Sequence, residues 1–314
     1  MSGASAAPAR RTAQALMWVV PALWSSNYLI ARAADGVIGP HLLATGRWAL
    51  AALLLLPLTA RGLWSKRAAL RREWRQLAVL GALGMWICGA WVYLGGQGTS
   101  STNMALIYAV SPIAVAVIGA RLLHEPMHGR QWAGVALSLA GLLLVIAKGD
   151  LSHLLAVRFS AGDLWIVAAM VSWTAYSVLL KHWHSELGPA ERLVATIAGG
   201  LLCLLPFTLW EWRHSPPLPE PMRAAALVLA AAVLPGVLSY GAFSYLQREL
   251  GAARTALMLY LTPVYAPLLA WAILGEVPRW YHAAGAALIL PSIALATRSS
   301  PRGPVAAGEQ GERP

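Results

Sequence analysis

The sequence predicts an all-α polytopic membrane protein, with ten transmembrane helices arranged as two inverted-topology repeats of five. Three observations carry this prediction: the composition, the spacing of the charged residues and an internal repeat. Of the 314 residues, 58% are hydrophobic and 12% are charged, whereas soluble domains carry about 25% charged residues. So few charges cannot cover a globule of this size, which excludes a soluble enzyme and a disordered protein. The two cysteines stand in apolar runs, without the spacing of a disulfide framework or a metal site.

Runs without Asp, Glu, Lys or Arg mark the expected membrane spans. A bilayer core about 30 Å thick needs about 20 mostly apolar residues in a helix, and lipid offers no partners for free backbone groups. The 45-residue run 76–120 is long enough for two spans, with a turn expected at 95–101. The predicted spans are 15–34, 41–60, 76–95, 101–122, 130–148, 163–181, 192–210, 224–246, 254–274 and 280–297.

The distribution of Lys and Arg predicts the orientation. With ten spans both termini lie on one side, and the segments on that side hold 17 of the 24 cations, against 6 on the other side and Arg47 within a span. Because cytoplasmic loops are enriched in Lys and Arg, we expect a cytoplasmic N-terminal segment at 1–14 and a disordered cytoplasmic tail at 299–314. The net charge of +11 therefore records topology, and no nucleic acid partner is expected.

Two halves of the chain repeat each other, over 15–148 and 163–298. Each half holds five spans, an odd number, so the second copy enters the membrane from the opposite side. Such inverted repeats are typical of transporters, with substrate near the midplane between the halves. A shift of 149 residues carries Trp24 onto Trp173, Gly39-Pro40 onto Gly188-Pro189 and Pro57 onto Pro206, and a shift of 151 carries Pro112 onto Pro263, Glu125 onto Glu276 and Gly134 onto Gly285.

Several of these segments resemble the drug/metabolite transporter superfamily, EamA type, across 15–298. The resemblance implies a bacterial inner-membrane carrier or exporter of small metabolites, with spans 1, 3, 4, 6, 8 and 9 around a central cavity. In each half the glutamate stands 13 positions after the proline. The segments that carry the resemblance are Trp24-Ser25-Ser26-Asn27, Gly46-Arg47-Trp48, Ser111-Pro112 through Glu125, and Thr262-Pro263 through Glu276.

Polar and aromatic side chains at mid-depth predict a substrate pocket. A buried amide, indole or phenol needs a partner, so each is expected to face protein or a cavity rather than lipid. Each one alone could equally belong to an interfacial belt or to helix packing. The predicted substrate-binding residues are Trp24, Ser25, Asn27, Trp86, Tyr93, Asn103, Tyr108, Trp173, Tyr176, Tyr240 and Tyr260, with Tyr245 and Tyr265 as further candidates.

Five residues are expected to gate or support the pocket. Arg47 is the one charge well inside a predicted span, and it could serve function, snorkel outward beside Trp48, or pair with a backbone carbonyl. Pro112 and Pro263 predict matched bends. Glu125 and Glu276 follow the ends of spans 4 and 9, where a gating role competes with simple capping of the connectors.

The sequence His124-Glu125-Pro126-Met127-His128 matches the HExxH zinc motif. That chemistry needs both histidines on one continuous helix, and Pro126 cannot lie inside one. We therefore expect no metal, no cofactor and no catalytic residues.

The predicted function is secondary transport of a small metabolite, such as an amino acid, an amphipathic compound or a drug-like compound. The route is alternating access at a central cavity in the bacterial inner membrane, with export as the expected direction. The expected partners are a small-molecule substrate and the lipid bilayer, and the chain is a monomer or a homodimer. The alternative is a membrane-embedded enzyme acting on a lipid or a small molecule.

Overall fold

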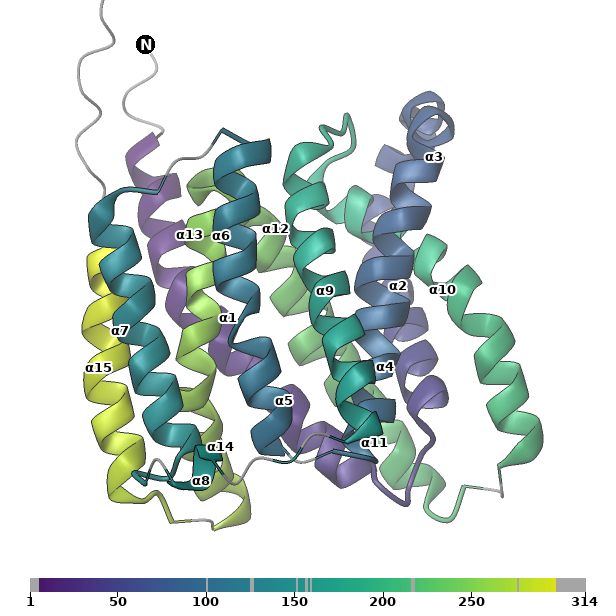
Figure 1. The fold of residues 1–314 in the computed structure, drawn as a ribbon. Helices are drawn as coiled ribbons and strands as arrows, with labels where there is room; N and C mark the ends of the chain where they lie inside the picture. The colour runs from purple at the N-terminus through teal and green to yellow at the C-terminus, as the bar shows by residue number, and fades with distance from the viewer. Residues whose placement is uncertain are drawn as a thin grey trace, which may run out of the picture.

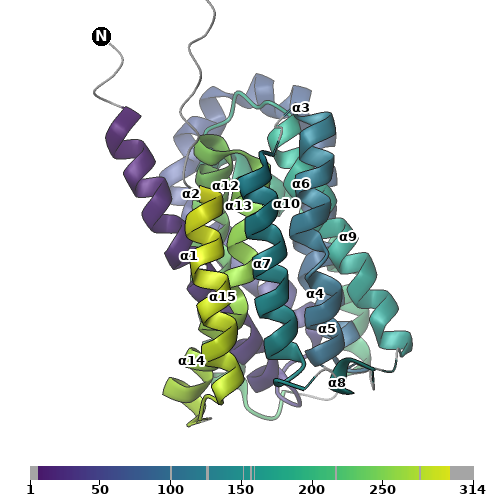
Figure 2. The ribbon, with the colours of Figure 1, turned by 60° about the vertical axis from the view of Figure 1, so that its left-hand side comes forward.

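The computed structural model describes residues 6–99, 101–124, 127–150, 152–155, 158, 160–215, 218–275 and 277–297. Throughout these ranges the regular elements are helices, without a strand, and the long ones stand side by side in a bundle (Figure 1, Figure 2). The first elements are α1 (Ala6–Ala34), α2 (Pro40–Ser65), α3 (Arg67–Gly81), η1 (Ala82–Ile87), α4 (Cys88–Gly96), α5 (Ser101–Tyr108), α6 (Ser111–Leu122), α7 (Gly129–Ile146) and α8 (Ser152–Leu155). The later elements are α9 (Ala161–His182), α10 (Pro189–His214), α11 (Pro221–Ala231), η2 (Ala232–Leu238), α12 (Ser239–Leu250), α13 (Ala252–Ala256), η3 (Leu257–Leu261), α14 (Thr262–Leu274) and α15 (Trp280–Thr297).

Among the described residues, eight helical stretches are long and apolar enough to cross a membrane. They make the chain a multi-pass membrane protein. The predicted spans 15–34 and 280–297 coincide with α1 and α15, which are helices but do not belong to this set of eight. The eight candidate spans are Pro40–Ser65, Arg67–Gly96, Asn103–Leu122, Gly129–Ile146, Ala161–His182, Pro189–His214, Pro221–Leu250 and Ala252–Ile273.

The basic segment 61–75, which lies between the predicted spans 41–60 and 76–95, is helical apart from a turn at Lys66. α2 continues to Ser65, and α3 begins at Arg67. Arg, Ala, Leu and Glu, which fill this segment, are strong helix formers in water. The runs without charged residues therefore predicted only the apolar part of these helices, and the full helices are longer.

Both Gly-Pro pairs of the repeat begin a helix. Gly39 and Gly188 have extended backbones, with ψ of 152° and 163°, and the prolines that follow open α2 and α10. Proline suits the first helical position, because the N–H that it lacks would have no partner there. Carboxylates satisfy the next free N–H groups: Glu211 accepts from His41 N at 3.1 Å and from Leu42 N at 2.9 Å.

In the described part of each half there is one π-helix, and the two lie at equivalent positions. A shift of 151 residues carries η1 onto the last six residues of η2. Pro235 lies inside η2, whereas η1 has no proline, so proline alone does not explain these turns. π-Turns interrupt the regular i→i+4 bonding and are frequent at functional sites.

The fourth span of each half is irregular as well as the third. α5 ends before α6 begins at Ser111, and the 3-10 helix η3 precedes α14. Pro112 and Pro263 are each the second residue of the helix after the break, a position that tolerates proline. The Tyr260 hydroxyl donates to Ala109 O at the first break, at 3.1 Å.

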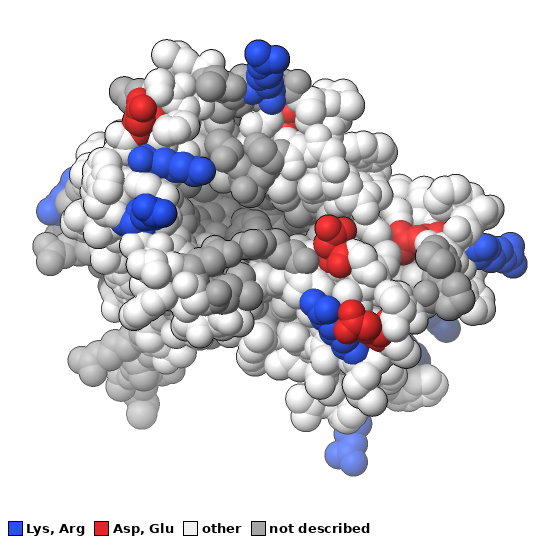
Figure 3. Space-filling model, turned by 90° about the horizontal axis from the view of Figure 1, so that it is seen from below, with Lys and Arg blue, Asp and Glu red and all other residues white. Residues whose placement is uncertain are grey.

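Helices of the two halves pack in matching pairs. α2 lies along α10, and α7 lies along α15. α1 packs against α12 and α14, and α9 packs against α4 and α6. In Figure 1, α1 begins at the upper end of the bundle, where α9 ends. Seen from below, the opposite end carries a few scattered charged side chains of both signs and is hollowed near its centre (Figure 3).

Candidate functional site

Six aromatic side chains gather where α1, α2, α9 and α12 meet. The rings of Trp24 and Trp173 meet edge to face, with centroids 5.1 Å apart. Tyr176 stacks on Trp173 at 5.5 Å and lies 5.9 Å from Tyr240. Offset or edge-on aromatic pairs stabilise the folded state by about 0.5–1.5 kcal/mol each, in addition to the effect of burying their surface. We call this group the aromatic cluster: Trp24, Trp48, Trp173, Tyr176, Tyr240 and Phe243.

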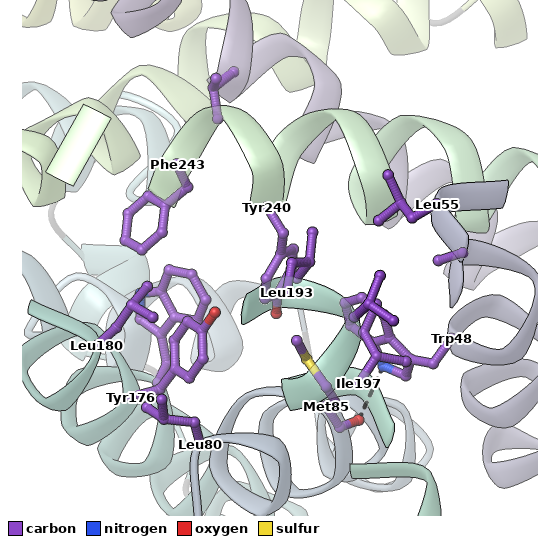
Figure 4. Packing of buried hydrophobic residues seen from close by; sticks show 14 of the residues in the cluster. Trp48, Leu55, Leu80, Met85, Tyr176, Leu180, Leu193, Ile197, Tyr240 and Phe243 are labelled. Atoms are coloured by element: carbon purple, nitrogen blue, oxygen red, sulfur yellow. Dashed lines mark hydrogen bonds between the residues drawn. The ribbon is translucent and has the colours of Figure 1, made fainter. Parts of the chain in front are cut away.

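The sequence predicted four members of the aromatic cluster: Trp24, Trp173, Tyr176 and Tyr240. Trp48 and Phe243 were missed, although both are fully buried (Figure 4). Phe243 lies one helical turn after Tyr240, on the same face of α12, and that spacing was the available signal. Trp48 directly follows Arg47, and a tryptophan beside a charged residue is equally typical of an interfacial belt.

Main-chain carbonyls of η1 accept hydrogen bonds from side chains of three neighbouring helices. Ser172 on α9 donates to Leu83 O at 2.8 Å, and Tyr240 on α12 donates to Gly84 O at 3.2 Å. Trp48 on α2 donates through Nε1 to Met85 O at 3.1 Å (Figure 4). Because the π-turn disturbs the regular bonding, these carbonyls are open to side chains. η1 thus fixes the positions of Trp48 and Tyr240 within the aromatic cluster.

Arg47 lies inside the bundle, with 4% of its surface exposed. Its Nη2 donates to Pro235 O of η2 at 2.9 Å, and its Cζ lies 4.4 Å from the ring centroid of Trp48. The snorkelling interpretation is therefore wrong, and pairing with a backbone carbonyl is the observed geometry. The guanidinium makes no ion pair with any carboxylate in the described part of the chain, and its Nε is buried without a partner there.

Two more predicted residues on α1 lie close to the aromatic cluster. Asn27 accepts a hydrogen bond from the Tyr93 hydroxyl of α4 at 2.9 Å. Ser25 is fully buried and donates to Pro21 O at 2.7 Å, within its own helix. Both lie within one helical turn of Trp24, so the structure brings Ser25, Asn27 and Tyr93 to the α1 side of the site.

Trp86 and Tyr108 pack against the same core as the aromatic cluster, through contacts of their own. Trp86 stacks on Phe207 of α10 at 5.0 Å, and the Tyr108 hydroxyl contacts Cys88 Sγ at 3.8 Å. Tyr260 contacts the first helix break, as described above. Tyr245 packs at the edge of the core that contains the aromatic cluster, and Tyr265 belongs to a second core with Tyr260.

Asn103 is held at the start of α9. Its amide donates to both carboxylate oxygens of Asp163, at 3.1 and 3.0 Å, and to Arg158 O at 2.9 Å. Asp163 also accepts from Thr99 and from Ser160 N. Trp173 follows Asp163 by ten residues, or about 15 Å along a helix. The structure therefore does not bring Asn103 together with the aromatic cluster.

The remaining predicted residues lie in or near the connectors. Glu125 and Glu276 lie outside the described residues. His124 follows the end of α6 and His128 precedes α7, so the two histidines of the HExxH match do not share a helix. Among the described residues no group of three His, Cys, Asp or Glu side chains is placed to hold a metal ion.

Comparison with known proteins decides the family. The model of the EamA-like transporter family matches residues 12–147 and again residues 160–298. The chain belongs to the EamA-like transporter family. The resemblance drawn from the sequence motifs is thereby confirmed, and membership of a transporter family sets aside the membrane-embedded enzyme.

Relatives across the EamA-like transporter family carry transporter names. An uncharacterized transporter of Bacillus subtilis, YyaM, is 26% identical over 87% of this chain and 89% of its own. An S-adenosylmethionine/S-adenosylhomocysteine transporter of Chlamydia trachomatis is 23% identical over 81% of this chain and 79% of its own. A probable terminal-alkyne amino-acid exporter of Streptantibioticus cattleyicolor is 25% identical over 88% of this chain and 90% of its own.

A solved crystal structure shares the fold. It superposes with a TM-score of 0.75 at 19% sequence identity, over 91% of this chain and 96% of that one. This likeness shows the fold alone, whereas small-molecule transport is supported by the family and by the names of the relatives.

Proposed function

We propose that this protein is a secondary transporter that moves a small amphipathic metabolite across the bacterial inner membrane by alternating access. The aromatic cluster is the observation that carries the proposal. It joins α1 and α2 of the first half to α9 and α12 of the second, at the place where rocking of the halves would open and close a path. Flat π faces beside hydroxyl and amide groups suit an amino acid or a drug-like compound.

The proposal includes ten spans in two inverted five-helix repeats, over 15–148 and 163–298. Exchange of the halves converts the α1–α12 contact into the α9–α4 contact, and the α1–α14 contact into the α9–α6 contact. α2–α10 and α7–α15 convert into themselves. A pseudo-two-fold axis in the membrane plane has this effect. The matching positions of η1 and η2 support the same relation.

Export, with both termini cytoplasmic, is our proposed direction and orientation. Support comes from the excess of Lys and Arg in the segments on the side of the termini and from the relative named as a probable exporter. We retain the 1–14 segment and the 299–314 tail as cytoplasmic, and the chain as a monomer or a homodimer. Pro112 and Pro263, with Glu125 and Glu276, are the proposed gate residues.

Counterflow in proteoliposomes tests the proposal. Vesicles loaded with one unlabelled compound would be tested for uptake of the labelled form, using aromatic amino acids, S-adenosylmethionine and purines. We expect at least one compound to accumulate transiently with wild type and not with Trp24→Ala or with empty vesicles. Equal fluxes in wild-type and empty vesicles for the whole panel would reject these substrate classes, and flux unaffected by Trp24→Ala would reject the site.

A further inference from the structure

A cavity of about 260 Å³ opens at one end of the bundle, between α9, α10 and α12. Three cationic side chains line it, Lys181, Arg192 and Arg248, and no carboxylate is among its described lining residues. Tyr176 of the aromatic cluster forms part of its wall. The three cations favour a negatively charged occupant, in competition with the buried carboxylate of Glu73, which accepts a hydrogen bond from Ser185 of the cavity wall.

Arg192 is fixed in the wall of the cavity. Its Nη1 donates to Leu180 O at 2.8 Å and its Nη2 donates to Trp183 O at 2.7 Å, which ties the guanidinium to the end of α9. Its Nε is buried and has no partner among the described residues. A guanidinium that donates from both Nη atoms holds its three remaining N–H groups in fixed directions, which favours binding because little freedom is left to lose.

Two other buried polar atoms of the cavity wall lack partners. The Thr196 hydroxyl and Gln247 Oε1 make no hydrogen bond within the described structure, although both residues are at most 2% exposed. The orientation of the Gln247 amide is fixed because its Nε2 donates to Ser177 O, which only accepts, at 2.9 Å. Buried polar groups are nearly always paired, so three unpartnered polar atoms on residues that line one cavity favour a polar ligand that reaches them.

Two positions of the cavity wall are filled by apolar packing in the first half. By the repeat, Arg192 corresponds to Leu43, and Ser244, which also lines the cavity, corresponds to Tyr93. Leu43 and Tyr93 pack together in an apolar cluster with Ile30. The first half therefore lacks the arginine of this cavity, and its own buried cation, Arg47, stands at the position of Thr196.

We propose that this cavity binds a carboxylate or phosphate group, with Arg192 Nε and the Thr196 hydroxyl as donors. Lys181 supplies a second cation: its Nζ donates to Gln247 O at 3.0 Å and has further N–H groups. Gln247 Oε1 accepts from a hydroxyl or amine of the same ligand. This anion site is separate from the proposed transport function. Its test measures binding and does not depend on flux.

Titration of the full-length protein tests the proposal. The protein would be placed in nanodiscs of phosphatidylcholine alone and titrated with inorganic phosphate or citrate at constant ionic strength, followed by calorimetry and thermal unfolding. We expect saturable binding and a rise in Tm. Thr196→Val should weaken binding at least tenfold without lowering the Tm of the unliganded protein, because its hydroxyl holds no partner. Lys181→Met should also weaken binding.

Arg213→Gln is the matched control. Arg213 is an exposed cation near the other end of α10, 21 residues from Arg192, and its loss should leave binding unchanged. Nanodiscs with phosphatidylglycerol distinguish the source of the anion. If the lipid headgroup occupies the cavity, phosphate binding disappears in wild type and the lipid raises the Tm of wild type more than that of Thr196→Val. Absence of saturable binding of phosphate, citrate and this lipid, or equal binding by wild type and Thr196→Val, would overturn the proposal.

Discussion

The Arg47 guanidinium of α2 donates to the main-chain carbonyl of Pro235 in η2, at 2.9 Å. The bond joins the second span of the first half to a π-helix of the second half. Its counterpart in the other half is absent, because the repeat places Thr196 opposite Arg47. A cation buried without a carboxylate partner is costly, and such residues in membrane proteins are commonly functional.

The variant Arg47→Met distinguishes a role of Arg47 in transport from a role in the stability of the fold. Loss of the bond to Pro235 O costs about 1.5–3 kcal/mol, and removal of a buried unpaired charge offsets that cost. We therefore expect a small change in the Tm of the purified protein and a fall in counterflow of more than about tenfold, a ΔΔG‡ above about 1.4 kcal/mol. Arg47→Lys, which keeps the charge but not the planar group, should retain partial flux. A large fall in Tm with Arg47→Met would instead make Arg47 a structural residue.

We predict that transport requires the aromatic ring of Trp24. Its centroid lies 5.1 Å from Trp173 and 5.2 Å from Phe243. Trp24→Ala should abolish counterflow and lower the free energy of unfolding by about 2 kcal/mol, less than the about 3–5 kcal/mol of a fully buried tryptophan. Trp24→Phe should keep most of both. Trp132→Ala, at a tryptophan 39% exposed, is the control, and equal effects of the two alanine variants would contradict a specific role.

Gly81 marks the closest approach of α3 to α10. A Cβ on Gly81 would lie 2.3 Å from Gly200 N and 2.4 Å from Thr196 O, both backbone atoms. Backbone atoms cannot rotate away, so Gly81→Ala should destabilise by about 3 kcal/mol or more. A Cβ on Gly241 meets nothing within 4 Å, so Gly241→Ala should stabilise by about 0.5–1 kcal/mol. Thermal unfolding of both variants in one detergent checks the pair.

Much of the helix pattern could be predicted because apolar length and Gly-Pro pairs are local signals. The turn expected at 95–101 falls where α4 gives way to α5, and Gly39-Pro40 and Gly188-Pro189 begin helices as a repeated pair. The correspondence of Trp24 with Trp173 also anticipated part of the site, since equivalent residues on the first helix of each half meet where the halves join.

The π-helices and the polar partners could not be predicted. Hydropathy carries no information on whether a backbone bond spans four residues or five, so η1 and η2 left no signal in the sequence. Asn103 was predicted to face substrate because a buried amide needs a partner, and that partner is Asp163, 60 residues away. Contacts at such separations depend on packing, which residue types alone do not specify.

Cysteine labelling tests the proposed orientation without changing any of the 24 cations. In a background with Cys88→Ala and Cys203→Ala, Ser65→Cys places a thiol at the exposed end of α2, and Met222→Cys places one near the start of α11, where Met222 is 84% exposed. We expect a membrane-impermeant maleimide to label the Met222→Cys protein in intact spheroplasts, and the Ser65→Cys protein only after lysis. The reverse pattern would place the termini outside, and the excess of cations would then not determine topology as the positive-inside rule requires.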